Sequence, residues 1–444
     1  MSGGTVALDL FAGTGWGVAL QARGIREGGV EIMPEAQASR AAAGMETIYS
    51  DVWDGLLSDD PIVFAHTLQI ASPPCQSFSL AGKGAGRAAL DDVLRAIDDR
   101  AFERPARLRA LGADTDDRTA LVLTPLAHVH RDRPMFVTWE QVPPVLPVWE
   151  ACAAVMRDMG YSVWVGIIRA EQYGVPQTRR RAVLMARADG IDAAPPVPTH
   201  SRYYEREPQR LDAGVEKWVS MADALGFGGF DLVGNQVPRG RARGEYHSRP
   251  STAPAQTLTG AGARSWVLRS NYSSGSGGEA PEGNKLPRTE RSINEPATKL
   301  TSKAGSMRWV RRGLESRPAS TITGGGTETG GAEPIAKLDR YVSSPDWVGD
   351  KARLRPEEAA VLQSYPADFP FQGTNGRVFL QIGNAVPPLM GGAIIDELLA
   401  PAALRAVALD AAGLCSKVTE SHKTYRVRLG LPPVPVPARQ GGRR

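Results

Sequence analysis

The sequence predicts an α/β protein with a parallel-type sheet, interrupted by a second domain that is loop-rich and mostly β. Three observations lead to this fold class. From residue 5 to about residue 194, short apolar runs alternate with helical stretches, as is typical of α/β folds. A glycine-rich turn follows the first apolar run. The α/β pattern returns after Leu354, beyond a region rich in Gly, Ser, Thr and Arg.

The individual elements follow from the periodicity of the apolar residues. The first strand is expected at 6–11, where an apolar run enters the glycine-rich turn at 12–17. The same patterns predict strands at 67–71 and 135–139, a strand pair at 162–168 and 182–186 around a loop at 172–181, an amphipathic helix carrying Leu90, Val93, Leu94 and Ile97, and helices at 356–364 and 389–399.

A Pro-rich stretch at 195–198 marks a domain boundary. Beyond it lies an imperfect repeat of Pro-led segments at 254–259, 296–301 and 318–323. Their uneven spacing argues against a solenoid and favours related short strands. We therefore expect a main domain at 1–199 and 346–400, an inserted domain at 200–345, and a basic tail at 401–444 whose Pro/Gly/Arg-rich end is disordered.

The net charge of +4 conceals an uneven distribution. Residues 200–345 hold 21 Lys+Arg against 15 Asp+Glu, and residues 401–444 hold 8 against 2. The remainder holds 23 against 31, so an acidic body carries two basic appendages. This asymmetry is expected of a protein that grips a polyanion, although a solvated basic surface would explain the charge equally well.

The chain has three cysteines, Cys75, Cys152 and Cys415, which lie far apart. They form neither a disulfide framework nor a zinc-ligand spacing, so we expect no metal. The N-terminus lacks the basic start and apolar core of a signal peptide, and no stretch of eighteen apolar residues occurs. We expect a cytoplasmic protein without a membrane-spanning helix.

The first strand runs into the turn Asp9-Leu10-Phe11-Ala12-Gly13-Thr14-Gly15. Glycine lets the backbone approach a nucleotide-like ligand without a clash at Cβ. Glu31 and Asp51 follow at offsets that suit ribose hydroxyls and an adenine amino group. Standing alone, they would be read as an ordinary turn with surface acids at strand ends.

The sharpest feature is Ser72-Pro73-Pro74-Cys75-Gln76-Ser77. The two prolines force an extended backbone, so Cys75 is presented where a strand ends. A cysteine in this polar setting is a poor core residue and a good nucleophile once its thiolate is favoured. Cys152 and Cys415 are instead interpreted as small buried hydrophobic residues.

Two further groups of charged residues lie at strand ends. Glu140 ends the apolar run at 135–139, so its carboxylate is expected at the same sheet edge as Cys75. Arg179 and Arg181 alternate and would face one way in an extended segment. Arginine stays charged and is suited to hold a carbonyl oxygen or a phosphate. Taken singly, Glu140 also fits an ordinary acid at a strand end, and Arg179 and Arg181 fit a solvated basic loop.

Together these motifs resemble the cytosine-C5 DNA methyltransferase family, over residues 5 to about 399. The resemblance is carried by the order of the segments and is far more specific than any one of them. The matching segments are Asp9-Leu10-Phe11-Ala12-Gly13, Pro74-Cys75-Gln76, Glu140-Gln141-Val142, Gln177-x-Arg179-x-Arg181 and Gly383-Asn384-Ala385-Val386-Pro387-Pro388, with supporting matches at Asp117-Arg118, 354–358 and 362–366.

The resemblance implies a Rossmann-like S-adenosylmethionine-dependent methyltransferase fold with an inserted target-recognition domain at 200–345. Cys75 would attack C6 of a cytosine, Glu140 would hold or protonate the N3 side, and Arg181, helped by Arg179, would hold O2. The residues implied at the S-adenosyl-L-methionine site are Asp9, Phe11, Ala12, Gly13, Thr14, Gly15, Glu31, Asp51, Pro74, Asn384 and Val386.

The resemblance also implies the partner. The family acts on double-stranded DNA and flips the target base out of the stack, because C6 is unreachable in a stacked duplex. Arginines of the basic inserted domain would then contact phosphates and base edges. We expect a nucleoid-associated monomer that needs no metal and no membrane.

Three departures from the family pattern stand out. Gln141 replaces the usual Asn, so the side chain that braces the active-site loop is longer by a methylene. A charged helical insertion around 88–114 lies where the family has a mobile loop over the DNA. The tail at 401–444 has no counterpart in the family pattern.

Three alternatives remain open from the sequence. One branch of the family methylates tRNA with the same motifs, although the large basic domain disfavours this. A non-catalytic relative could flip a base without methylating it, against which the intact Cys75, Glu140 and Arg181 argue. A Rossmann oxidoreductase would lack a complete G-x-G-x-x-G turn and leaves the Pro-Cys segment unexplained.

Overall fold

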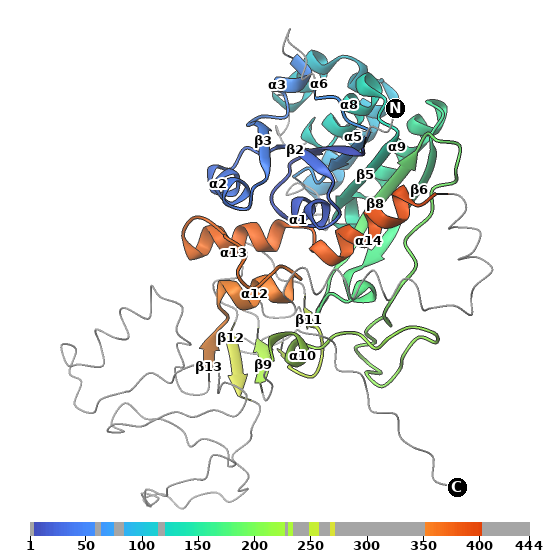
Figure 1. Ribbon diagram of the computed structural model, residues 1–444. Helices are drawn as coiled ribbons and strands as arrows, with labels where there is room; N and C mark the ends of the chain where they lie inside the picture. The colour runs from blue at the N-terminus through green and yellow to red at the C-terminus, as the bar shows by residue number, and fades with distance from the viewer. Residues whose placement is uncertain are drawn as a thin grey trace, which may run out of the picture.

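The computed structural model describes residues 4–57, 64–74, 84–113, 120–226, 230–233, 248–256, 267–270 and 351–401. The largest body in this part of the chain is a seven-stranded sheet with helices on both faces (Figure 1). This arrangement confirms the predicted α/β class. Cys75, Asp117 and Arg118, most of residues 257–350 and the tail from residue 402 lie outside the described residues.

The main sheet has the strand order β3-β2-β1-β4-β5-β8-β6. Strands β1 to β5 pair in parallel, whereas β8 is antiparallel to both of its neighbours. The predicted pair at 162–168 and 182–186 is confirmed as β6 and β8. The strands are β1 (Val6–Leu10), β2 (Arg26–Val30), β3 (Glu46–Tyr49), β4 (Leu68–Ala71), β5 (Phe136–Gln141), β6 (Ser162–Arg169) and β8 (Arg180–Arg187).

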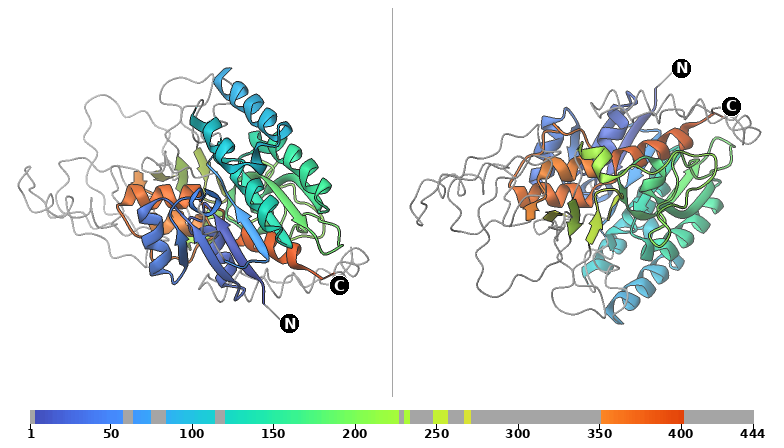
Figure 2. Two further views of the ribbon diagram at one scale, coloured as in Figure 1. Left: turned by 90° about the horizontal axis from the view of Figure 1, so that it is seen from above. Right: turned by 90° about the horizontal axis from the view of Figure 1, so that it is seen from below.

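The strands alternate their side chains between two hydrophobic clusters, one on each face. In β1, Leu8 and Leu10 face a cluster formed with α5, α8 and α9, whereas Ala7 faces a cluster formed with α1 and α14. Figure 2 shows these helices on opposite sides of the sheet. The bounds are α1 (Gly15–Gln21), α2 (Pro34–Ala42), α3 (Asp54–Leu57), α5 (Gly84–Asp98), α6 (Pro105–Ala113), α8 (Thr124–Asp132) and α9 (Leu146–Asp158).

The helical insertion predicted around 88–114 is present as α5 and α6, joined by the short 3-10 helix η1 (Ala101–Glu103). Phe102 of η1 is 1% exposed and belongs to the same hydrophobic cluster as the sheet. Cys152 lies in α9 and is buried, as expected of a small core residue, and this burial raises the pKa of its thiol. The insertion is therefore packed into the main body.

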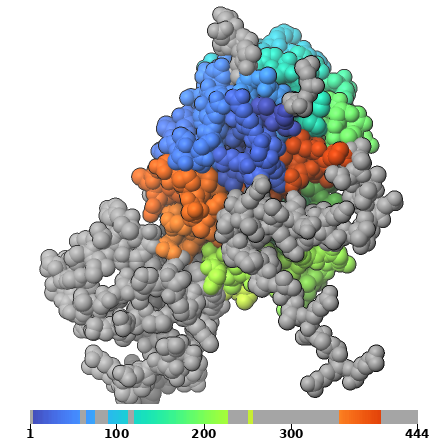
Figure 3. Space-filling view, viewed as in Figure 1, coloured from blue at the N-terminus to red at the C-terminus, as the bar shows by residue number. Residues whose placement is uncertain are grey.

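The last described segment returns to the first one through α12 (Pro356–Leu362), α13 (Asn375–Asn384) and α14 (Pro388–Leu399). Helix α14 packs on α1, where the ring of Trp16 lies against Gly391 and Arg23 forms an ion pair with Asp396 at 2.5 Å. Figure 3 shows the two ends of the described chain, blue and orange, in direct contact.

Part of the inserted region, together with residues 351–353 beyond its predicted end, forms a second, antiparallel sheet with the order β10-β9-β12-β13. Its strands are β9 (Phe230–Val233), β10 (Ser248–Pro250), β12 (Val267–Ser270) and β13 (Lys351–Arg353). The first Pro-led repeat contains β11 (Ala255–Gln256), which pairs in parallel with β7 (Gln177–Thr178) of the main domain. The other two repeats lie outside the described residues. Helix α10 (Met221–Leu225) precedes the second sheet and begins with a capping box between Ser220 and Asp223.

One segment of the described chain, Asn375–Leu399, is long and apolar enough to cross a membrane by length and composition. It consists of α13 and α14, and 83% of the apolar window is buried inside the protein. A core helix passes the same test, so this segment is weak evidence for a membrane span.

Candidate active site

The strand order places two loops side by side at the carboxyl edge of the sheet. The chain leaves β1 toward β2 on one side, while β4 lies on the other, and such a switch point opens a crevice in α/β sheets. The glycine turn follows β1, and Ser72 to Pro74 follow β4. The indole Nε1 of Trp16 donates to Ser72 Oγ at 3.0 Å, which ties the two loops together.

The glycine turn is shaped by two residues in the left-handed region, Phe11 with φ 60° and Gly13 with φ 49°. A non-glycine residue at positive φ is uncommon, so Phe11 holds a conformation that the surroundings enforce. A Cβ on Gly13 would meet no atom within 4 Å, so the space above the turn is open. A Cβ on Gly15 would lie 2.1 Å from the Val386 carbonyl oxygen, so only glycine fits there.

The remaining turn residues are held by hydrogen bonds. Ala12 is buried, and its amide donates to the Val30 carbonyl at 3.0 Å. The Thr14 hydroxyl lies 2.7 Å from the Tyr365 hydroxyl, and both residues are buried. These contacts fix the turn against β2 and against the C-terminal return.

Glu31 and Asp51 follow the carboxyl ends of β2 and β3. The two oxygens of Glu31 accept hydrogen bonds from the amides of Gly13 at 2.8 Å and Met33 at 2.7 Å. One oxygen of Asp51 accepts from the amide of Trp53 at 3.0 Å. A carboxylate offers about four lone-pair positions, so both acids can accept further hydrogen bonds. Ile32, which the sequence analysis did not single out, is 69% exposed beside Glu31 and offers an apolar face.

Asp9 differs from the other predicted cofactor residues because its side chain is completely buried. Burial, followed by the nearby carboxylate of Glu27, raises the pKa of Asp9 well above its ordinary value. Glu27 in turn forms an ion pair with the buried Arg40 at 2.8 Å. Arg40 also donates to the Gly13 carbonyl at 3.1 Å, so Asp9 reaches the glycine turn only through this network.

The segment leading to Cys75 is braced by β5. The side-chain amide of Gln141 donates to the Pro73 carbonyl, and its oxygen accepts from the amide of Val142. The longer side chain at position 141 therefore still reaches this loop. Pro74 is half-buried and is the last described residue before Cys75.

Glu140 and Arg181 form the central ion pair of the site, with Arg181 Nε 2.6 Å from Glu140 Oε1. The Glu140 side chain is 4% exposed and the Arg181 side chain 11%. Arg179 is buried more deeply, and its guanidinium donates to the Gly383 carbonyl at 2.9 Å. Burial, followed by the charge of Arg181, lowers the pKa of Arg179 to about 9. Arg179 therefore holds the C-terminal return, and Arg181 holds Glu140.

The return places Val386 against the glycine turn, two residues after Asn384. Asn384 ends α13 and is exposed, whereas Val386 is 2% exposed and packs against Gly15. The structure thus brings the described predicted residues from seven separate segments to one sheet edge, with Asp9 lying beneath it.

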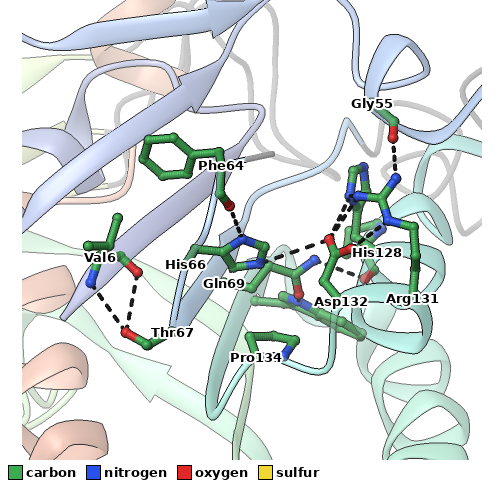
Figure 4. Close-up of polar contacts among 12 residues, drawn as sticks. Val6, Gly55, Phe64, His66, Thr67, Gln69, His128, Arg131, Asp132 and Pro134 are labelled. Carbon is green, nitrogen blue, oxygen red and sulfur yellow. Dashed lines mark hydrogen bonds and ion pairs between the residues drawn. The ribbon is translucent and has the colours of Figure 1, made fainter. Parts of the chain in front are cut away.

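A different polar cluster lies at the opposite, amino edge of the sheet (Figure 4). Asp132 lies 4.0 Å from His66 and 3.6 Å from His128, and it also accepts from Arg131. Burial alone would raise the pKa of Asp132, but hydrogen bonds from Arg131 and His128 hold it well below its ordinary value. Among the described residues, no group of three or more His, Cys, Asp or Glu is arranged to hold a metal ion.

Comparison with known proteins points to one family. The family model described as C-5 cytosine-specific DNA methylase matches residues 112–400. The Type II methyltransferase M1.HphI of Haemophilus parahaemolyticus is 26% identical over 330 residues, covering 74% of this chain and 67% of the relative. The Type II methyltransferase M.AgeI of Thalassovita gelatinovora is 26% identical over 340 residues, covering 64% and 78%. A solved methyltransferase structure from Entamoeba histolytica has a TM-score of 0.46 at 12% identity, over 89% of this chain and 98% of that one.

Fold and family match together define a methyltransferase of the α/β class. The chain belongs to the C-5 cytosine-specific DNA methylase family, since the family model covers well over half of it. Its enzyme class is DNA (cytosine-5-)-methyltransferase. This membership excludes the oxidoreductase alternative.

Proposed function

We propose that this chain transfers a methyl group from S-adenosyl-L-methionine to C5 of a flipped-out cytosine in a specific duplex DNA sequence, through a covalent bond between Cys75 and C6. One observation carries the proposal. The buried Glu140 is held by Arg181 at the same sheet edge as the Pro73–Pro74 segment, and Gln141 joins that segment to the strand of Glu140. Cys75 is the next residue along the chain.

The described residues fit the cofactor. The open space above Gly13 leaves room for a ligand against the backbone, and Ile32 offers an apolar face for a ring. Glu31 would accept from ribose hydroxyls and Asp51 from the adenine amino group. The exposed Asn384 would complete the pocket from the C-terminal return. When bound, S-adenosyl-L-methionine supplies an electrophilic methyl group on its sulfonium.

The roles of the reacting residues follow from their chemistry. The thiolate of Cys75 forms a bond to C6, and the electron pair of the C5–C6 double bond makes C5 nucleophilic. Glu140 stabilises or protonates N3, which makes C6 more electrophilic. Arg181 keeps the Glu140 carboxylate oriented and is available to the O2 oxygen. After C5 has accepted the methyl group, a base removes the C5 proton, the S–C6 bond breaks and the thiolate of Cys75 is restored.

The reaction requires that the cytosine leave the helix, at a cost of a few kcal/mol. The inserted domain at 200–345 carries excess positive charge and would grip phosphates and read base edges as the target-recognition domain. Residues 1–199 and 346–400 would form the catalytic domain. We propose a monomeric protein of the cytoplasm, associated with the nucleoid and suited to a restriction–modification system.

A duplex with 5-fluorocytosine at the target position tests the covalent step. Fluorine cannot leave C5 as a proton, so the wild-type protein should remain bonded to the DNA and migrate as a retarded band under denaturing conditions. The target is found beforehand by bisulfite sequencing of DNA from cells that express the protein. Cys75→Ser is the matched control, which should bind DNA but neither trap it nor transfer a tritiated methyl group.

Two outcomes would contradict the proposal. One is full methylation by the Cys75→Ser variant, which would show that Cys75 is not the nucleophile. The other is an absence of any trapped adduct on DNA that the wild-type protein methylates. A parallel assay with tRNA separates the DNA reaction from the tRNA alternative, and tritium transfer by the wild-type protein excludes a non-catalytic base flipper.

A further inference from the structure

Beside the Glu140–Arg181 pair, two arginines lie opposite one another at the carboxyl edge of the sheet. Arg169 ends β6 and Arg180 begins β8, and the two are direct partners in the antiparallel register. Arg180 immediately precedes Arg181, and its side chain is exposed. Adjacent like charges on neighbouring strands are destabilising, so this pairing calls for an explanation.

A third arginine reaches this edge from the segment that follows the main domain. The amides of Thr199 and His200 both donate to the Gln172 carbonyl at 3.0 Å, which anchors the start of the segment just after β6. Asp212 then closes it into a loop, because its carboxylate accepts from the Arg202 amide at 2.8 Å and from the Tyr204 hydroxyl at 2.7 Å.

The loop keeps its positive charge oriented. The guanidinium of Arg202 lies 5.1 Å from the centre of the Tyr204 ring, and that of Arg210 lies 4.2 Å from the same ring. Cation–π contacts of this kind fix the direction of an arginine without neutralising it. The loop is therefore preorganised, with Arg202 oriented on the Tyr204 ring and Arg210 also 3.8 Å from the Glu207 carboxylate.

Among the described residues, no ion pair is formed by Arg169, Arg180 or Arg202, although the nearby charge of Glu171 acts favourably on Arg169. Within this part of the chain, no carboxylate lies within 4.0 Å of their guanidinium groups, and the buried Nε of Arg202 has no hydrogen-bond partner. Burial, followed by the charge of Arg202, lowers the pKa of Arg169. Arginine does not lose its proton in proteins, so the repulsion persists until an anion arrives.

We propose that Arg169, Arg180 and Arg202 bind a backbone phosphate of the DNA duplex beside the target cytosine, an inference that rests on the function proposed above. Guanidinium groups bind phosphate oxygens through paired, charge-assisted hydrogen bonds. Phosphate contacts fix the register of a protein on DNA, and rotating a nucleotide out of the stack requires its backbone to be held. Arg180 directly precedes Arg181 in β8, so this phosphate site would lie next to the reacting site along the strand, on its other face.

The test uses Arg169→Gln and Arg202→Gln in the full-length protein. Binding to a fluorescent duplex that contains the target is measured by anisotropy between 50 and 200 mM NaCl. Each variant should bind about tenfold more weakly, the worth of one charge-assisted hydrogen bond. Its plot of log affinity against log salt should be less steep by about 0.9, as expected for one lost phosphate contact. At saturating DNA, kcat should stay within about twofold, so the loss appears in KM.

Arg26→Gln provides a matched control, because it removes the same charge from an exposed side chain at the amino edge of the sheet, where Arg26 pairs with Glu46 at 3.3 Å. Thermal melting verifies that all three variants are folded. The proposal is overturned if Arg169→Gln and Arg202→Gln keep the affinity and salt slope of Arg26→Gln.

The wild-type protein separates the two proposals. If it methylates its duplex while the variants match the control, only the phosphate site is lost, whereas a wild-type protein that methylates no duplex refutes the proposed function itself. The titration is repeated with an RNA duplex of the same length. A loss of affinity confined to RNA would assign the arginines to another partner and overturn the proposal.

Discussion

Both halves of the main sheet give a buried guanidinium built-in partners, as Arg187 has in Asp189 at 2.5 Å, but the half formed by β5, β8 and β6 also carries two arginines that face one another. In the half formed by β1, β2 and β3, the single buried guanidinium of Arg40 meets Glu27 at 2.8 Å and also donates to Thr47 and to the carbonyls of Gly13 and Glu46. In the half formed by β5, β8 and β6, Glu140 is bonded to Arg181, while Arg169 and Arg180 face one another.

The difference separates scaffold from binding surface. A charge that is removed from water is tolerated when its partners are built in, as around Arg40, and is destabilising when they are missing. In the first half, the partners of Arg40 come from the protein itself, and one of them, the Gly13 carbonyl, belongs to the glycine turn. The second half leaves positive charge without a described partner, which is the arrangement expected where a polyanion completes the protein. Substitutions in the two halves should therefore affect different measurements.

The largest effect is expected at Glu140. Glu140→Gln removes the charge that stabilises or protonates N3 while keeping nearly the same shape, so kcat should fall by about 10²- to 10⁴-fold. Tritiated methyl transfer at saturating DNA measures it. Glu150→Gln, an exposed acid on α9, is the control and should retain wild-type activity. A Glu140→Gln enzyme with wild-type activity would contradict the proposal that the half formed by β5, β8 and β6 holds the reacting residues.

Arg40→Met should act on stability. It leaves Glu27 charged and unpaired in the interior, so the free energy of unfolding should fall by about 3–5 kcal/mol. Urea denaturation measures this change. The exposed pair of Arg26 and Glu46 joins the neighbouring strands β2 and β3. Arg26→Met should lower the free energy of unfolding by less than about 1 kcal/mol. Equal losses in the two variants would show that burial does not distinguish this network.

The smallest effect is expected from Asp9→Asn, and it depends on pH. The pKa of Asp9 is raised in the folded protein, chiefly by burial. Stability from its neutral form is therefore complete below the unfolded value of about 3.9 and is lost as pH rises through the folded pKa. Since Asn does not titrate, the free energy of unfolding of the variant should rise relative to that of the wild-type protein as pH rises, by at most about 1.4 kcal/mol per pH unit. Parallel curves from pH 4.5 to 8.5 would refute a raised pKa.

Much of the fold could be predicted because it depends on local periodicity. The apolar runs that predict β1, β4 and β5 and the pairing of β6 with β8 are confirmed. No strand is predicted from the sequence at β2 or β3. For β2 the reason is that Arg26–Val30 carries a glutamate and two glycines in place of an apolar run. The glutamate pairs with Arg40, and Gly29 makes room for it, since the Arg40 guanidinium lies 2.0 Å from a Cβ built on Gly29, whereas Gly28 makes room for Phe64.

The candidate site was predictable to the extent that it depends on strand ends. Parallel strands deliver Glu31 and Glu140 to one edge, so their grouping follows from topology. The network of Asp9, Glu27 and Arg40 depends on tertiary contacts between three elements, and no spacing along the chain reveals it. The opposition of Arg169 and Arg180 likewise appears only once the register of β6 and β8 is known.

The hydrogen bond between Thr14 and Tyr365 joins residues that are 351 positions apart. The glycine turn is thus synthesised well before the residue that holds it. At a synthesis rate of 5–20 residues per second, the interval is about 20 to 70 s. A chain that stops short of Tyr365 lacks the hydroxyl that holds Thr14, so the turn proposed to bind the cofactor would not be held in place.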